Sequence, residues 1–196
     1  MRREPQKVEE FTEVLLPLLS QHGSAVSLAN VAMLRGWAKV MGGQCEDGIR
    51  EVQDGLTAWR ATGSKFQVTF RLVRAAEACL FAGAKDEGLK LSDGALDHSG
   101  DAWFLPEVYR VRGELFNRPA QTDDVEECFS QALKVAQAQG ARLLELRAAM
   151  SLARLWRDQG KMQQARELLA PVYDWFTEGF GTHDLKAARA LLEDMR

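Results

Sequence analysis

Apolar residues recur at intervals of three and four along almost the whole chain, as in Leu143, Leu146, Met150, Ala153 and Trp156. This spacing puts them on one side of an α-helix, so it predicts amphipathic helices and not strands. Residues that favour helix dominate, and only 5 prolines interrupt them. The pattern predicts about ten helices, near residues 5–21, 24–41, 44–62, 64–82, 85–98, 102–117, 122–139, 141–159, 161–177 and 182–195.

Short breaks that contain glycine separate the predicted helices. Gly42 and Gly43 follow one helix, and glycine can adopt the left-handed conformation that ends a helix. Gly63 ends the next helix. Ser64, with Gln67 three residues later, has the pattern of a capping box at the start of the helix that follows.

The last predicted helix has the pattern of a cap for the end of a helical array. Thr182 precedes it, and Asp184 lies in its first turn, where a carboxylate favours the positive end of the helix. One face is apolar and the opposite face is charged, so we expect the helix to cover its neighbours. The apolar positions are Leu185, Ala188, Leu191 and Leu192, and the charged positions are Lys186, Arg189, Glu193 and Asp194.

A period of about 40 residues relates the predicted hairpins, whose turns fall near residues 43, 83, 120 and 160. The last hairpin has the tetratricopeptide spacing of small, aromatic, glycine, alanine and large apolar positions in Ala153, Trp156, Gly160, Ala165 and Leu169. The sequence therefore predicts an all-α fold, a right-handed superhelical array of antiparallel helical hairpins with a C-terminal capping helix. We expect one helical-repeat domain over 1–196, with a leading helix at 5–22, hairpins at 24–62, 64–98, 102–139 and 141–177, and the cap at 182–195.

Long strings of the C-terminal part resemble a known family. Residues 113–119 (GELFNRP), 127–161 and 165–196 are similar to the C-terminal tetratricopeptide-type region of bacterial signal-transduction ATPases that begin with an adenylate/guanylate-cyclase-like or winged-helix domain. The resemblance covers roughly 24–196 and is strongest from Tyr109 onward. It implies a sensing or partner-docking array in bacterial signalling. It implies no ATPase or cyclase activity, because the sequence lacks the GxxxxGK[ST] phosphate loop.

Composition removes several classes of function. The formal net charge is −3, which offers no general attraction for nucleic acid or an anionic membrane. No apolar run approaches the roughly 20 residues of a membrane span, so we expect a cytoplasmic protein. The 3 cysteines and 3 histidines show no metal-ligand or nucleophile–base spacing. We therefore expect no enzymatic activity, no cofactor and no metal.

The first helix of each tetratricopeptide hairpin lines the concave face, which gives a set of candidate groove residues. In the N-terminal half the predicted lining is largely apolar, and it is either an open surface or simply buried. In the C-terminal half it is charged, and it either binds a partner or is neutralised between neighbouring helices. The candidates are Asn30, Met33, Trp37, Phe70, Val73, Glu77 and Phe81, then Arg110, Glu114, Arg147, Arg154 and Arg157.

The leading hypothesis is a protein-interaction module that docks a peptide or helix in this groove. The arginines predict a partner segment with an acidic residue or a C-terminal carboxylate, and an apolar anchor entering near Trp37 and Phe81. A second hypothesis is a sensor that binds a small apolar ligand between the N-terminal hairpins, beside Met33, Trp37, Phe70 and Phe81. A third is self-association through an apolar N-terminal edge, which would give a homodimer.

Overall fold

The computed structural model describes residues 4–98, 102–116 and 122–195. Within these ranges the regular elements are all helical, which confirms the predicted all-α class. Besides a short 3₁₀ turn at Ala102–Phe104, they are α1 (Pro5–His22), α2 (Ala25–Met41), α3 (Cys45–Ala61), α4 (Val68–Phe81), α5 (Lys85–Leu96), α6 (Leu105–Phe116), α7 (Thr122–Ala138), α8 (Arg142–Asp158), α9 (Met162–Asp174) and α10 (His183–Asp194).

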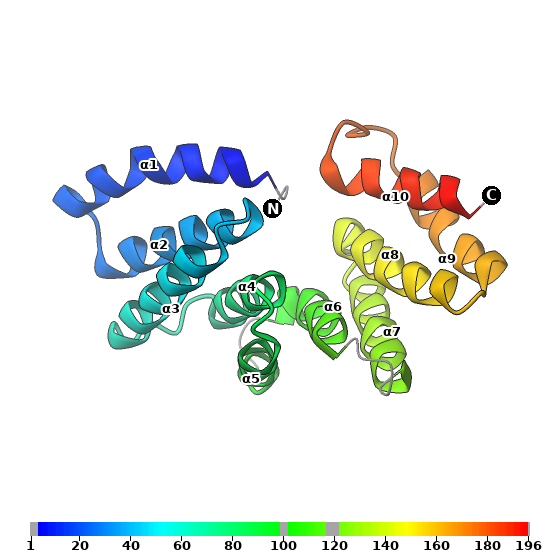
Figure 1. The fold of residues 1–196 in the computed structure, drawn as a ribbon, viewed down its shortest axis with the longest axis horizontal. Coiled ribbons are helices and arrows are strands. Elements are labelled where there is room, and N and C mark those ends of the chain that lie inside the picture. Colours follow the sequence, from blue (N-terminus) through cyan, green and yellow to red (C-terminus); the bar gives the residue numbers. More distant parts are fainter. Residues whose placement is uncertain (1–3, 99–101, 117–121, 196) are drawn as a thin grey trace. The chain divides into compact units, whose positions relative to one another are not determined.

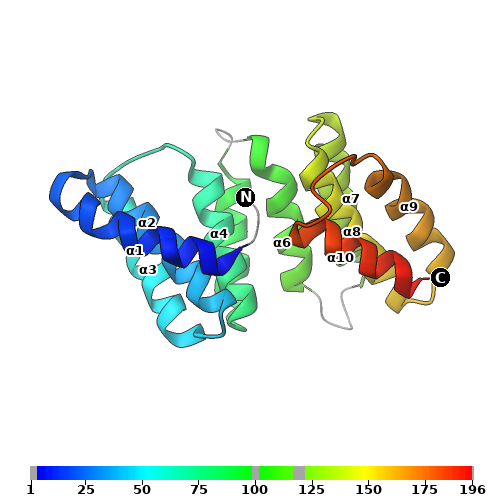
Figure 2. The same cartoon turned by 90° about the horizontal axis from the view of Figure 1, so that it is seen from above.

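The helices form two compact units (Figures 1 and 2). The N-terminal unit is Glu4–Ala102 and contains α1 to α5. Helices α2 and α3 form one antiparallel hairpin, α4 and α5 form the next, and α2 packs against α4. Helix α1 packs on α2 alone among the described helices.

The C-terminal unit contains Trp103–Arg196. Helices α6 and α7 form one hairpin, α8 and α9 form the next, and α10 packs against both α8 and α9. Helix α8 therefore lies between α6 and α10 and contacts both. The core between α8, α9 and α10 includes Leu146, Ala149, Ala165, Leu169 and Ala188, each 0 % exposed.

Glycines bring α2 and α3 close together. A Cβ atom on Gly36 would lie 2.7 Å from the backbone oxygen of Gly48, and one on Gly55 would lie 2.7 Å from Cγ of Met33. These distances leave no space for a side chain, so the two helix backbones approach more closely than larger residues would allow. The small residues of the repeat pattern thus have a direct packing role in this hairpin.

Turn glycines occupy the predicted positions. Gly43, Gly83 and Gly160 have φ values of 90°, 78° and 80°, and residues with a Cβ atom rarely adopt this left-handed conformation. Each of them stands two positions before the first residue of the next helix, which is α3, α5 or α9. The turn expected near residue 120 lies outside the described residues.

The predicted capping box at Ser64 is wrong. Helix α4 begins at Val68, and Gln67 before it is left-handed with φ of 53°. The Ser64 hydroxyl instead accepts a hydrogen bond from the Phe66 N–H at 3.3 Å. Serine competes for nearby backbone groups in turns as readily as at helix starts, so the same residue pattern here stabilises a loop.

The predicted C-terminal cap has the expected amphipathic form. Leu185, Ala188 and Leu191 are buried, whereas Lys186 and the other charged positions of that face are exposed. Thr182 stands at the N-cap position as expected, but its hydroxyl donates to the Gly179 carbonyl and does not cap the helix. Asp184 lies in the first turn as expected and has a further role described below.

Candidate functional site

Most of the predicted N-terminal lining lies inside the N-terminal unit. Trp37 and Val73 are 0 % exposed, Glu77 is 1 % exposed and Met33 is 4 % exposed. Trp37 Nε1 donates to Glu77 Oε2 at 2.9 Å, and Arg74 Nη1 donates to the same oxygen at 2.6 Å. Four of the seven side chains are therefore not open to a partner, because packing of α2 against α4 buries them and pairs their polar atoms.

The other three predicted positions remain accessible to different degrees. Phe81, at the end of α4, is 47 % exposed, and Asn30 and Phe70 are half-buried. The guanidinium of Arg74 lies 5.7 Å from the centre of the Phe70 ring, so this ring already stacks against a cation of its own chain. An apolar anchor at Trp37 is excluded by its burial, whereas Phe81 is open to contact.

In the C-terminal unit the charged positions lie on α6, α8 and α10 and form a network of ion pairs. Arg110 holds Glu107 through two hydrogen bonds, from Nε at 3.0 Å and from Nη2 at 2.8 Å. Arg147 donates from Nε and Nη2 to Asp184 Oδ2 at 3.0 and 2.7 Å, and its Nη1 lies 3.7 Å from Glu107 Oε1. All four side chains are buried. Arg147 thereby links the three helices.

We call the four predicted arginines of this unit, Arg110, Arg147, Arg154 and Arg157, the arginine layer. Glu114 accepts a hydrogen bond from Ser151 at 2.8 Å. Arg157 pairs with Asp158 at 2.9 Å and with Asp194 at 3.6 Å. Neutralisation between neighbouring helices, one of the two interpretations left open by the sequence, therefore applies to Arg147 and Arg157, whereas Arg110 pairs with Glu107 and Glu114 of its own helix.

Arg154 differs from the other three arginines. It is half-buried, and it makes no hydrogen bond or short ion pair with any residue in the described ranges. Burial lowers the pKa of Arg154. The Glu114 carboxylate opposes this shift, and repulsion from Arg110 and Arg157 adds to it. For Arg147, burial also favours a lower pKa, but Glu107 and Asp184 together raise it. Arg154 thus has positive neighbours, and Glu114 attracts it without a direct ion pair.

A small cavity of about 30 Å³ lies beside Arg154. This volume is on the scale of one water molecule. Three arginines of the layer contribute to its wall, so a hydrogen-bond acceptor placed there would meet several donors. The lining residues are Arg110, Arg147, Met150, Ser151, Arg154, His183 and Asp184.

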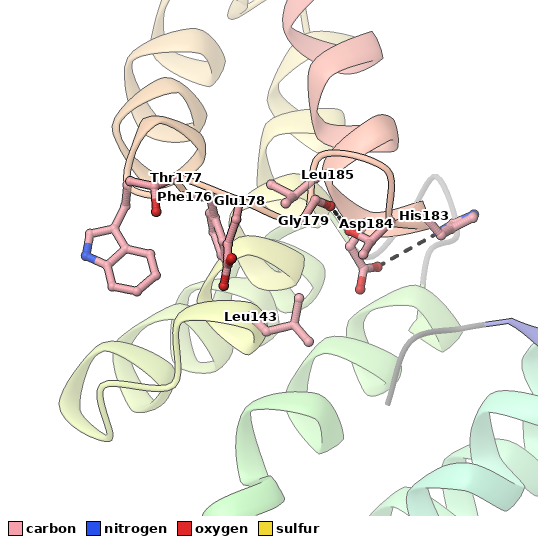
Figure 3. A pocket seen from close by; sticks show the side chains of 10 residues that line it. Leu143, Phe176, Thr177, Glu178, Gly179, His183, Asp184 and Leu185 are labelled. Atoms are coloured by element: carbon pink, nitrogen blue, oxygen red, sulfur yellow. Dashed lines mark hydrogen bonds and ion pairs between the residues drawn. The ribbon is translucent and has the colours of Figure 1, made fainter.

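A larger and mostly apolar pocket of about 370 Å³ lies at the start of α10 (Figure 3). Leu143 of α8, Phe176 after α9 and Leu185 of α10 form its apolar walls, and Glu178 projects beside Phe176. Asp184 and His183 line this pocket and also the small cavity beside Arg154, so the two spaces share a wall. This pocket has no counterpart among the residues predicted from the sequence.

Sequence reasoning identified the arginines but missed Asp184 as their partner. It assigned Asp184 only to the helix end, because it stands two residues after Thr182. The structure uses the same carboxylate for the ion pair with Arg147, which lies 37 residues earlier in the chain.

Two of the cysteines, Cys79 and Cys128, are held in their less reactive thiol form. Burial is the largest cause that raises the pKa of Cys79 to about 11, and burial also raises the pKa of Cys128. Among the described residues, no group of His, Cys, Asp and Glu could hold a metal ion. Nor does any helix in those ranges combine the length and apolar character needed to cross a membrane.

Comparison with solved structures identifies the fold. A point variant of a putative kinesin light chain with nearly identical TPR-like repeats, from Podosopora anserina, is similar over 86% of this chain and 85% of that chain, with a TM-score of 0.56 and 16% identity. A putative kinesin light chain with nearly identical TPR-like repeats, also from Podosopora anserina, is similar over 98% of this chain and 89% of that chain, with a TM-score of 0.54 and 15% identity. The predicted tetratricopeptide-like class is therefore confirmed. No protein-family model matches the sequence, and no curated relative matches it.

Proposed function

We propose that this chain is a non-catalytic protein-interaction module whose C-terminal unit docks an acidic segment of a partner protein at Arg154. The observation that supports this proposal is that Arg154 makes no hydrogen bond or ion pair with any described residue, whereas its neighbours Arg110, Arg147 and Arg157 are all paired. A planar guanidinium holds a carboxylate through two parallel hydrogen bonds. An incoming carboxylate would relieve the repulsion that Arg154 experiences from Arg110 and Arg157.

The register of the repeats accounts for this unpaired charge. Arg147 and Arg157 on α8 each meet an acidic residue of α10 that stands 37 residues later, Asp184 and Asp194. The residue 37 positions after Arg154 is Leu191, which is buried and cannot serve as a counter-ion. The C-terminal helix therefore neutralises two arginines of α8 and offers no acidic residue at the corresponding position to the one between them.

Selection of peptides on the immobilised protein tests the proposal. A random peptide library selected on the wild type should become enriched in Asp, Glu or a free C-terminal carboxylate close to an apolar residue. The same library selected on the Arg154→Ala variant should lose the acidic enrichment. For a selected peptide, Arg154→Ala should weaken binding by about 1–3 kcal/mol, the scale of one charged hydrogen bond. Added salt should weaken binding to the wild type more than to the variant.

Arg166→Ala serves as the matched control, because Arg166 is an exposed arginine on α9. It should leave the affinity for the selected peptide unchanged. Arg154→Ala should also leave the melting temperature nearly unchanged, since no short ion pair is lost. If Arg154→Ala lowers the melting temperature but not the affinity, the arginine is structural and the proposal fails.

The broader setting follows from the sequence resemblance and is proposed on that basis. Residues 1–196 would act as one helical-repeat domain with a regulatory or sensing role in bacterial cytoplasmic signalling. The partner would be a protein and not a nucleic acid or membrane, given the formal net charge of −3. The open Phe81 side chain would offer an apolar contact in the N-terminal unit. Affinity capture from the native lysate tests the nature of the partner.

The apolar pocket at the start of α10 supports a second candidate function, the binding of a small apolar ligand. Its volume of about 370 Å³ is within the range of small-molecule sites, roughly 300–1,000 Å³. Trp175, which also lines it, provides a fluorescent probe of occupancy. Hydrophobic ligands that change Trp175 emission in the wild type but not in a Leu143→Glu variant would support this function, and a library without such ligands would count against it.

A further inference from the structure

The exposed face of α1 carries a row of large apolar side chains. Phe11, Val14, Leu15 and Leu18 are 68 %, 64 %, 40 % and 57 % exposed. Their spacing of three, four and seven places them on one side of the helix. A different side of the helix contains the buried Thr12 and packs on α2. The exposed side of α1 therefore carries a continuous apolar stripe.

The other terminal helix of the chain does the reverse. Its exposed positions are His183, Lys186, Arg189, Ala190, Glu193 and Asp194, and no large apolar residue of α10 is among the exposed ones. A polar outer face is what the end of a helical-repeat array needs in water. Helix α10 has such a face, whereas the stripe on α1 is an exposed apolar patch and has the character of a contact surface.

We propose that the α1 stripe, Phe11, Val14, Leu15 and Leu18, binds the same stripe of a second copy of this chain, with the two α1 helices antiparallel. The pattern of positions reads the same in both directions along the helix. A two-fold axis between positions 14 and 15 places Phe11 opposite Leu18 of the second copy and Val14 opposite its Leu15. Such self-complementarity is the requirement of a two-fold symmetric interface.

Charges on α1 are compatible with this pairing. With a turn of about 100° per residue, Glu13 lies on the side of the helix away from the stripe, and Glu10 flanks it. In the antiparallel arrangement Glu10 lies next to Gln21 of the second copy, so no two carboxylates face each other. The antiparallel direction also pairs the positive end of each helix with the negative end of the other.

The size of the stripe sets the expected strength. Four partly exposed side chains offer a few hundred Å² per copy, whereas a standard stable interface needs about 800 Å² per partner. We therefore expect a weak dimer, whose population rises between about 1 μM and 1 mM protein. The interaction lies entirely in the N-terminal unit and does not depend on the proposed function of Arg154.

Sedimentation velocity over that concentration range is the first test. The wild type should shift from monomer to dimer, and Leu18→Glu should remain monomeric with an unchanged circular-dichroism spectrum. The matched control is Met162→Glu, which places the same charge on another exposed apolar residue, 46 % exposed at the start of α9. It should dimerise like the wild type. A wild type that is monomeric throughout, or a Leu18→Glu variant that still dimerises, would overturn the proposal.

Disulfide trapping tests the direction of the helices. In the antiparallel pair the two copies of position 14 are offset by only about 1.5 Å along the helix axis, and the two copies of position 11 by about 10 Å. Mild oxidation should therefore cross-link Val14→Cys and not Phe11→Cys, with the oxidised wild type as the baseline for the native cysteines. Cross-linking of both variants would indicate a parallel pair, and cross-linking of neither would remove the α1 contact.

Discussion

The Arg147–Asp184 pair connects α8 to the capping helix α10, and breaking it should be costly. Both side chains are buried, and Asp184 Oδ2 receives both hydrogen bonds from Arg147. Arg147→Ala removes the cation and leaves a carboxylate in the interior without its partner. Loss of one partner of a buried pair costs about 3–5 kcal/mol. For a chain of 196 residues, we expect the melting temperature to fall by about 6–20 °C.

Thermal and urea unfolding followed by circular dichroism measure this loss. Arg166→Ala, an exposed change on α9, should stay within about 0.5 kcal/mol of the wild type. Asp184→Asn should destabilise less than Arg147→Ala, because the amide oxygen can still accept from Arg147 and Glu107 remains 3.7 Å from the Arg147 Nη1 atom. The double variant Arg147→Met with Asp184→Leu should lose less than the sum of the two single losses, since it leaves no unpaired buried charge.

Unfolding of Arg147→Ala at the same temperature as Arg166→Ala would contradict a stabilising role of the Arg147–Asp184 pair. A double variant that is as unstable as the sum of Arg147→Met and Asp184→Leu measured separately would also contradict this role, because the two residues would then contribute independently.

Four further predictions rest on packing and burial. Gly48→Ala should cost about 1–3 kcal/mol because its Cβ would lie 2.7 Å from a backbone oxygen of α2. Gly94→Ala, whose Cβ would make only an ordinary 3.7 Å contact, should stabilise α5 by about 0.5–1 kcal/mol in the same urea titration. Deleting residues 182–196 should expose the core beneath α10 and cause aggregation, measured by light scattering, and a monomeric truncation of unchanged stability would contradict this. Alkylation of Cys79 by iodoacetamide should accelerate as the pH rises toward its pKa of about 11, because only the thiolate reacts, and it should lag behind Cys45 at pH 8.

The sequence predicted the fold well because the relevant signals are local. Helix spacing, turn glycines at positions 43, 83 and 160, and the amphipathic pattern of α10 all act within a few residues, and the structure places them as expected. The failure at Ser64 has the same origin. A serine hydroxyl has several backbone groups within reach, and the local pattern does not decide whether it caps a helix or stabilises a turn.

The N-terminal lining was harder to predict because burial depends on the neighbouring helix. The positions of Trp37 and Glu77 on the first helices of two hairpins were recognised, but an indole and a carboxylate on such helices can equally line a groove. The structure brings them to 2.9 Å from each other in the interior. Trp37 and Glu77 are 40 residues apart, which is close to the repeat period. This separation is the feature of the sequence that could have identified them as hydrogen-bond partners.

The same signal explains the arginine layer. Equivalent helices of successive repeats lie side by side, so a residue meets positions roughly one period away along the chain. Arg147 meets Asp184 and Ser151 meets Glu114, each at a separation of 37 residues. Applied to Arg154, this register points to Leu191 on α10, which is buried and has no charge to offer. Leu191→Asp should therefore place a carboxylate beside Arg154 and reduce the affinity for a selected acidic peptide. Leu192→Asp, one position along and half-buried, should reduce it less, and equal affinities in both variants and the wild type would mean that Arg154 does not contact the peptide.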